Sequence, residues 1–79
     1  MKSKNIIILE EIITTVLKLK GDVDFLNLEQ SNLSKWDSIV IINLVVAVES
    51  EFGVKISNSE LENFTSFKKI VSILDGKGL

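Results

Sequence analysis

Ser38 is the residue of this chain whose type and position are best suited to covalent chemistry. It follows Asp37 and opens a largely apolar run, residues 39–48, that contains no Gly or Pro. Asp is a good N-cap, because its carboxylate accepts hydrogen bonds from the free N–H groups of a helix's first turn. With Asp37 as the cap, the hydroxyl of Ser38 is left free at the positive end of the helix, which favours a phosphate group.

Several other chemistries are excluded by composition. The 79 residues include no Cys and no His, which excludes Ser-His-Asp and Cys-His catalytic arrangements and the common zinc sites. Asp22 and Asp24 are spaced like calcium ligands, but Leu26 stands at the fifth position and the glycine of a calcium-binding loop is missing. We therefore expect no catalytic residue and no metal site, and we do not expect an enzyme.

The segment Asp37–Ile39, with Trp36 before it, resembles the Asp-Ser-Leu motif of acyl carrier proteins. The resemblance continues along nearly the whole chain, in Glu49–Gly53, Lys55–Leu61, Phe64–Ser66 and Leu74. In that family the serine carries a 4′-phosphopantetheine arm. The resemblance implies that Ser38 is the attachment site of this cofactor.

A carrier role follows from the resemblance. A phosphopantetheinyl transferase would move the arm from coenzyme A to the Ser38 oxygen, and Asp37 would help to position the metal or basic contacts of the transferase. The thiol of the arm would hold an acyl group as a thioester, so that a chain without Cys could take part in thiol chemistry. The carrier would present this group to separate acyl-activating and acyl-transferring or condensing enzymes of fatty acid or polyketide-like biosynthesis.

Two positions depart from the family pattern. Fatty-acid carriers usually have acids just after the motif and one turn later, where this chain has Val40 and Asn43. The Trp-Asp-Ser form resembles stand-alone carriers of specialised pathways, whereas the Gly-Gly-x-Ser motif of peptidyl carriers is absent. D-alanyl carriers share the Asp-Ser pair. A D-alanyl or aminoacyl carrier therefore remains an alternative, as does an unmodified helical module that binds a protein groove.

The hydrophobic pattern predicts an all-α fold, a small four-helix bundle in a single domain over residues 1–79. The helices are expected at about Asn5–Lys20, ended by Gly21; at Ser38–Phe52, ended by Gly53; at about Ser59–Asn63; and after a cap at Thr65 or Ser66. The third helix is thus short, and residues 76–79 are expected to form a frayed tail.

A long loop over residues 22–36 is expected between the first two helices. Loops of this length are unusual in compact domains unless they are anchored. The expected anchors are Phe25, Leu26, Leu28 and Leu33. Trp36, directly before the helix cap, is expected to pack on Ile41 as a hydrophobic staple and to be partly buried.

The second helix is expected to present an apolar strip to partner proteins. Steps of 100° per residue from Ser38 place a core-facing stripe on one side. The opposite side is also mostly apolar, and exposed apolar strips usually mark contact sites. The residues expected to recognise partners are Ile39, Val40, Asn43, Val46, Ala47, Glu49 and Glu51. We expect apolar contact to dominate docking, with charge steering mainly at Asp37 and the two glutamates.

The net charge of −2 is unevenly distributed. Residues 21–54, which include Ser38, hold one Lys and six acids. Because no basic patch is present to neutralise phosphates, nucleic-acid binding is not expected. The apolar stretch Ile6–Leu9 stops at Glu10 and is too short for a secretory core or a membrane span. A cytoplasmic monomer is therefore expected.

Overall fold

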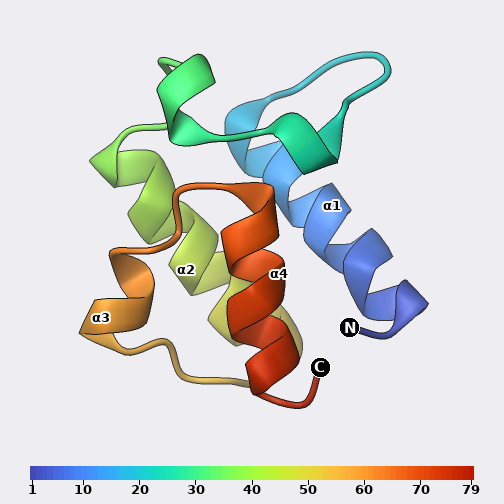
Figure 1. Cartoon of the computed structure of the whole chain (residues 1–79), viewed down its shortest axis with the longest axis vertical. Coiled ribbons are helices and arrows are strands. Elements are labelled where there is room, and N and C mark those ends of the chain that lie inside the picture. The colour runs from blue at the N-terminus through green and yellow to red at the C-terminus, as the bar shows by residue number, and fades with distance from the viewer.

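The computed structural model describes residues 1–79 and contains four α-helices and no strands (Figure 1). The helices are α1 (Ser3–Leu17), α2 (Ser38–Phe52), α3 (Asn58–Leu61) and α4 (Phe67–Gly76), with short 3₁₀ turns η1 (Phe25–Asn27) and η2 (Gln30–Asn32) in the first loop. The predicted all-α bundle with a long first loop and a short third helix is confirmed. None of the helices combines the length and the apolar character that crossing a membrane would require.

One hydrophobic core lies between α1, α2 and α4 and positions the start of α2. Each of these helices contributes residues at spacings of three and four, which is the pattern of an amphipathic helix. The buried apolar residues are Leu9, Ile12, Ile13, Leu17, Trp36, Ile41, Leu44, Val45, Val48, Phe64, Phe67, Ile70 and Leu74. Full burial of one such aliphatic side chain contributes about 1.5–3 kcal/mol. The core therefore stabilises all three helices together.

The end of α1 differs from the prediction of Lys20 followed by Gly21. Lys18, not Gly21, takes the left-handed conformation that ends the helix, with φ 53° and ψ 45°. The N–H of Leu19 donates to the Thr14 carbonyl at 3.0 Å, and the side chain of Leu19 packs against the core. This is the hydrogen-bonding pattern of a Schellman motif, which offsets the strain of a non-glycine residue in that conformation.

The long loop crosses over the start of α4 and is fixed to it (Figure 1). The Phe25 ring lies 5.4 Å from the Phe67 ring, and the Phe67 N–H donates to the Leu28 carbonyl at 3.0 Å. Phe25, Leu28 and Leu33 pack against the core as predicted. Leu26 is 63% exposed, so its predicted role as an anchor is wrong.

Short polar hydrogen bonds set the ends of α3 and α4. Ser57 and Glu60 form a reciprocal capping box, so α3 begins and ends slightly earlier than predicted. Of the two predicted caps of α4, Ser66 is the one used, and it accepts from the Lys69 N–H at 3.1 Å.

The final residues of the chain are tied to α1. The Leu79 carbonyl accepts from the Lys2 N–H at 2.9 Å and from the Asn5 side-chain amide at 2.7 Å. The Leu79 N–H donates to the Leu74 carbonyl at 3.2 Å. The predicted frayed tail is therefore wrong, because these bonds hold the chain's two ends side by side.

Candidate functional site

Asp37 caps α2 in the predicted way. Its backbone is extended, with φ −102° and ψ −174°, and its Oδ1 atom accepts from the Val40 N–H at 2.9 Å. Ser38 is consequently the first residue of a 15-residue helix. The carboxylate satisfies one of the free N–H groups of the first turn and leaves the serine hydroxyl out of the capping.

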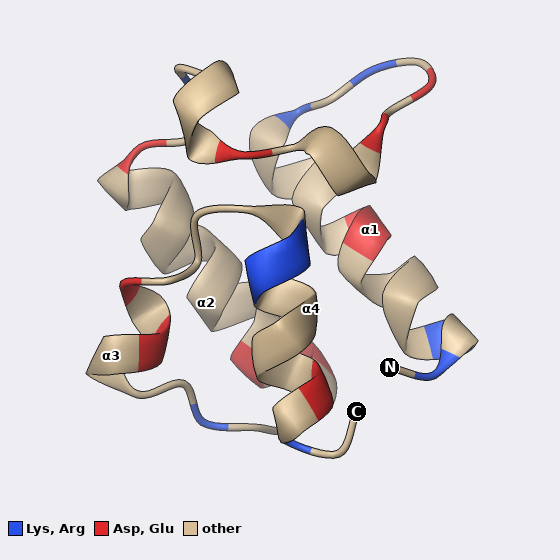
Figure 2. Ribbon diagram, viewed as in Figure 1, with Lys and Arg blue, Asp and Glu red and all other residues tan.

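The Ser38 side chain is exposed and makes no hydrogen bond within the protein. It stands where the aligned peptide dipoles of α2 give partial positive charge, so a phosphate ester on its oxygen would be favoured electrostatically. An arm linked through a phosphodiester is therefore compatible with this position, because the hydroxyl is accessible and the helix end carries partial positive charge. The site itself holds the acid Asp37, and no further charge follows along α2 until Glu49 (Figure 2).

Most other serines either use their hydroxyl in a hydrogen bond or do not follow a capping side chain at the start of a helix. Ser57 and Ser66 are used as helix caps, and Ser31 donates to the Glu29 carboxylate. Ser34 is exposed but lies in the loop, outside any helix. Ser3 also begins a helix, but it follows Lys2, which supplies no side-chain cap.

Trp36 fixes the approach of the chain to this site. Its side chain is 1% exposed, and its indole N–H donates to the Phe64 carbonyl at 3.0 Å. The Gln30 side-chain amide donates to the Trp36 carbonyl at 2.9 Å. Partial burial was predicted for Trp36, and this is wrong. The indole is fully buried because its polar N–H finds a partner inside the core.

The apolar strip on α2 was predicted to be exposed, and only part of it is. Ile39 and Val46 are 69% and 59% exposed, and Asn43 is also exposed. Val40 and Ala47 are half-buried and pack against the core. The exposed strip is therefore narrower than the sequence pattern indicates.

Ile42 belongs to this strip but is absent from the predicted set. It is 53% exposed and lies between Ile39 and Val46 on the helix, at spacings of three and four. The same 100° projection places it beside Val46, so this signal was present in the sequence. We use the term α2 strip below for Ile39, Ile42 and Val46.

The two glutamates near the end of α2 differ from one another. The Glu49 carboxylate accepts from the Ile56 N–H at 2.9 Å and so holds the link between α2 and α3. Glu51 is exposed, and neither of the chain's ion pairs involves it. Glu49 thus has a structural partner, whereas the carboxylate of Glu51 is free for an external contact.

Known proteins with related sequences include acyl carrier proteins. A family model described as "Phosphopantetheine attachment site" matches residues 8–74. The acyl carrier protein of Petrotoga mobilis is 34% identical over 68 residues, which cover 86% of this chain and 80% of that protein. The acyl carrier protein of Thermotoga maritima is 42% identical over 41 residues, which cover 52% of this chain and 51% of that protein.

No solved structure gives a significant match to the chain. The family match nevertheless spans most of the sequence, including the capped helix start at Asp37 and Ser38. The match to the Petrotoga protein covers most of both chains. The chain therefore belongs to the acyl carrier protein family, whose members are carriers with a covalent 4′-phosphopantetheine group and not enzymes.

Proposed function

We propose that Ser38 is the residue to which 4′-phosphopantetheine is attached. The observation that carries the proposal is an exposed, unbonded hydroxyl on the first residue of a long helix, directly after a capping aspartate. Helix N-termini favour phosphate groups because their free N–H groups and dipole are positive. Transfer from coenzyme A would join the Ser38 oxygen to phosphorus and release the nucleotide portion.

The residues around Ser38 would support this modification without taking part in catalysis. Asp37 holds the first turn of α2 and presents a carboxylate oxygen beside the serine, where it would meet the metal or basic groups of a phosphopantetheinyl transferase. Trp36 anchors the preceding backbone through its bond to Phe64. When bound, the arm supplies a thiol on which an acyl group is carried as a thioester.

We further propose that the chain is a stand-alone carrier, cytoplasmic and monomeric, that serves acyl-activating and acyl-transferring or condensing enzymes of a specialised pathway. The proposal is supported by Val40 and Asn43 at positions where fatty-acid carriers usually have acids, and by the absence of charge between Asp37 and Glu49. Partners would dock mainly through the α2 strip. Its three exposed aliphatic side chains lie on the helix that starts at Ser38.

The attachment site can be tested by incubating the chain with coenzyme A and a broad-specificity phosphopantetheinyl transferase. Intact mass should increase by one arm in the wild type and in Ser34→Ala, the matched loop serine. Ser38→Ala should give no increase. Modification of Ser38→Ala to the wild-type extent would refute the assignment.

A further inference from the structure

Gln30 lies in the loop before α2 and forms hydrogen bonds through both its backbone and its side chain. Its backbone N–H donates to the Thr65 carbonyl at 2.8 Å, and its side-chain amide donates to the Trp36 carbonyl at 2.9 Å. Because a carbonyl oxygen only accepts hydrogen bonds, the nitrogen of the amide must face Trp36. Figure 1 shows the segment between α3 and α4 passing beside this loop, and Glu29 and Ser66 pair there as an antiparallel bridge. Gln30 therefore connects the segment before α4 to the end of the loop.

The peptide group between Trp36 and Asp37 is held on both sides. Its carbonyl accepts from Gln30, and its N–H donates to the Lys35 carbonyl at 3.0 Å. The orientation of this peptide plane sets the φ angle of Asp37, which is −102° in the extended conformation of a helix cap. That angle in turn places the Asp37 carboxylate against the first turn of α2. Gln30 thus helps to fix the backbone from which the Ser38 side chain projects.

The bundle itself does not depend on the side-chain bond of Gln30. The residue is exposed, and its bond to Thr65 uses the backbone N–H, which any residue except proline supplies. The Trp36 indole is anchored separately, through the Phe64 carbonyl. Removal of the Gln30 amide would leave both of these anchors in place and release only the Trp36 carbonyl to water. The side chain therefore orders the backbone before the site more than it stabilises the fold.

We propose that Gln30 is a positioning residue for the modification of Ser38, an inference that rests on the proposed attachment of phosphopantetheine to this serine. In the transfer, the Ser38 oxygen forms a bond to the phosphorus of coenzyme A that bears the pantetheine. The bridging P–O bond breaks, the nucleotide leaves with the electron pair, and the serine proton passes to a base of the transferase. A reacting oxygen held in one place reacts faster than one that samples several positions. Gln30 restricts the backbone of this oxygen without touching the substrate.

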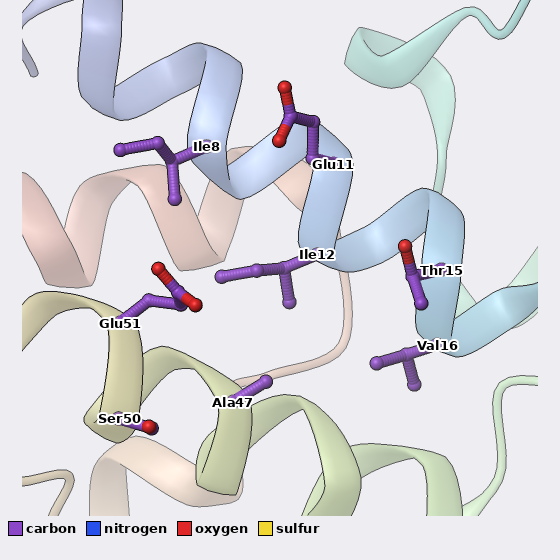
Figure 3. Close-up of a pocket in the computed structure, with 8 residues that line it drawn as sticks. All are labelled: Ile8, Glu11, Ile12, Thr15, Val16, Ala47, Ser50 and Glu51. Carbon is purple, nitrogen blue, oxygen red and sulfur yellow. The ribbon is translucent and has the colours of Figure 1, made fainter.

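Substitution of Gln30 would leave unchanged the surfaces of α2 that are open to partners. The groove of about 340 Å³ between α1 and α2 is lined by residues of these two helices alone, within Ile8–Val16 and Ala47–Glu51 (Figure 3). The α2 strip likewise contains no loop residue. A change at Gln30 should therefore lower kcat, the rate at which the bound carrier is modified, and leave the KM for the carrier nearly unchanged.

The test compares Gln30→Glu and Gln30→Met with the wild type in the assay with coenzyme A and a transferase. Glutamate replaces the hydrogen-bond donor by an acceptor, and methionine removes the donor without adding a charge. Both variants should have kcat about fivefold lower, as expected for one lost hydrogen bond, and KM within about twofold of the wild type. Amide hydrogen exchange at Asp37 should become faster in both, because its peptide group loses one of two partners.

Asn32→Asp is the matched control. The Asn32 side-chain amide donates to the Asn27 carbonyl at 2.9 Å in the same loop, so this variant loses the same kind of bond and gains the same charge away from Trp36. It should be modified at the wild-type rate. An equal loss of kcat in Asn32→Asp, or wild-type kcat in Gln30→Met, would overturn the role of Gln30 alone. A wild type that gains no arm at Ser38 would overturn the proposed function and this inference together.

Discussion

Asp37 combines a structural role and a proposed recognition role that single substitutions can separate. Its carboxylate caps α2 through the Val40 N–H, and asparagine can cap a helix about equally well without the charge. The cap depends on local chemistry, which is why the position of Ser38 at the start of a helix could be predicted from the sequence alone. Its exposure and its lack of internal partners required the folded structure.

Asp37→Asn should retain stability but slow the modification of Ser38 by a transferase about tenfold or more, since a charged hydrogen-bond acceptor is lost. Asp37→Ala should slow it as well and should lower the unfolding free energy by about 1 kcal/mol. Urea denaturation and the transferase rate measure the two effects. Wild-type modification of Asp37→Asn would show that the charge has no role in recognition.

Trp36 illustrates a contact that the sequence could not provide. Its position before the cap predicts packing on α2, but the partner of its indole N–H is the carbonyl of Phe64, 28 residues away. Local patterns contain no information on such a pairing. The depth of burial at the site was therefore underestimated.

Trp36→Phe should lower the unfolding free energy by about 1–3 kcal/mol, because the buried Phe64 carbonyl loses its donor. Circular dichroism in urea measures this change. Leu26→Ala, at an exposed position of the same loop, should change it by no more than about 0.5 kcal/mol. Equal stability of Trp36→Phe and the wild type would contradict the role given to this hydrogen bond.

At the scale of the elements, the helix ends were predicted with mixed success. The start and end of α2 agree with the prediction because Asp37 and Gly53 are strong local signals. The end of α1 was misplaced, since Lys18 takes a conformation that usually selects glycine. Packing of Leu19 against the core compensates for the strained conformation of Lys18. This packing depends on tertiary contacts, which a short segment of sequence does not reveal.

The capping box of α3 gives a pH-dependent contribution to stability. The backbone N–H of Ser57 and then the ammonium of Lys77 lower the pKa of Glu60 below its ordinary value of 4.5. A carboxylate with a lowered pKa stabilises the folded chain above the ordinary value, and this contribution is lost as the pH falls through the lowered one. The ionised form of Glu60 therefore favours the folded state.

The variant Glu60→Gln isolates this contribution, because glutamine can still form the capping box without a charge. The wild type should be more stable than the variant at neutral pH, and the difference should shrink as the pH is lowered below 4.5. Thermal unfolding of both chains over this range measures the difference. A difference that stays constant with pH would contradict the role of the charge.

At the scale of the whole molecule, α2 separates an internal face from an exposed face. Periodicity predicted the internal face well, because burial of aliphatic residues follows the helical repeat. The exposed face was predicted too broadly, because the projection does not show that Val40 and Ala47 pack against the core. A substitution that tests docking is better placed at Ile42, which is exposed, than at Val40, which packs against the core.

Ile42→Glu should leave the fold intact and reduce the kcat/KM of a transferase for this carrier about tenfold, since an apolar contact near Ser38 becomes charged. Leu26→Glu adds the same charge at an exposed loop position and should have little effect. Raising the salt concentration should weaken docking only modestly. Loss of activity in high salt, together with full activity of Ile42→Glu, would show docking by charge.

Mass spectrometry of the protein isolated from its own cells tests most directly whether Ser38 carries the 4′-phosphopantetheine arm. Intact mass and peptide mapping, performed without cleaving the thioester, report both the modification and its acyl group. One arm is expected, located on the peptide that contains Asp37 and Ser38. An unmodified chain, or an arm on Ser31 or Ser34, would contradict it.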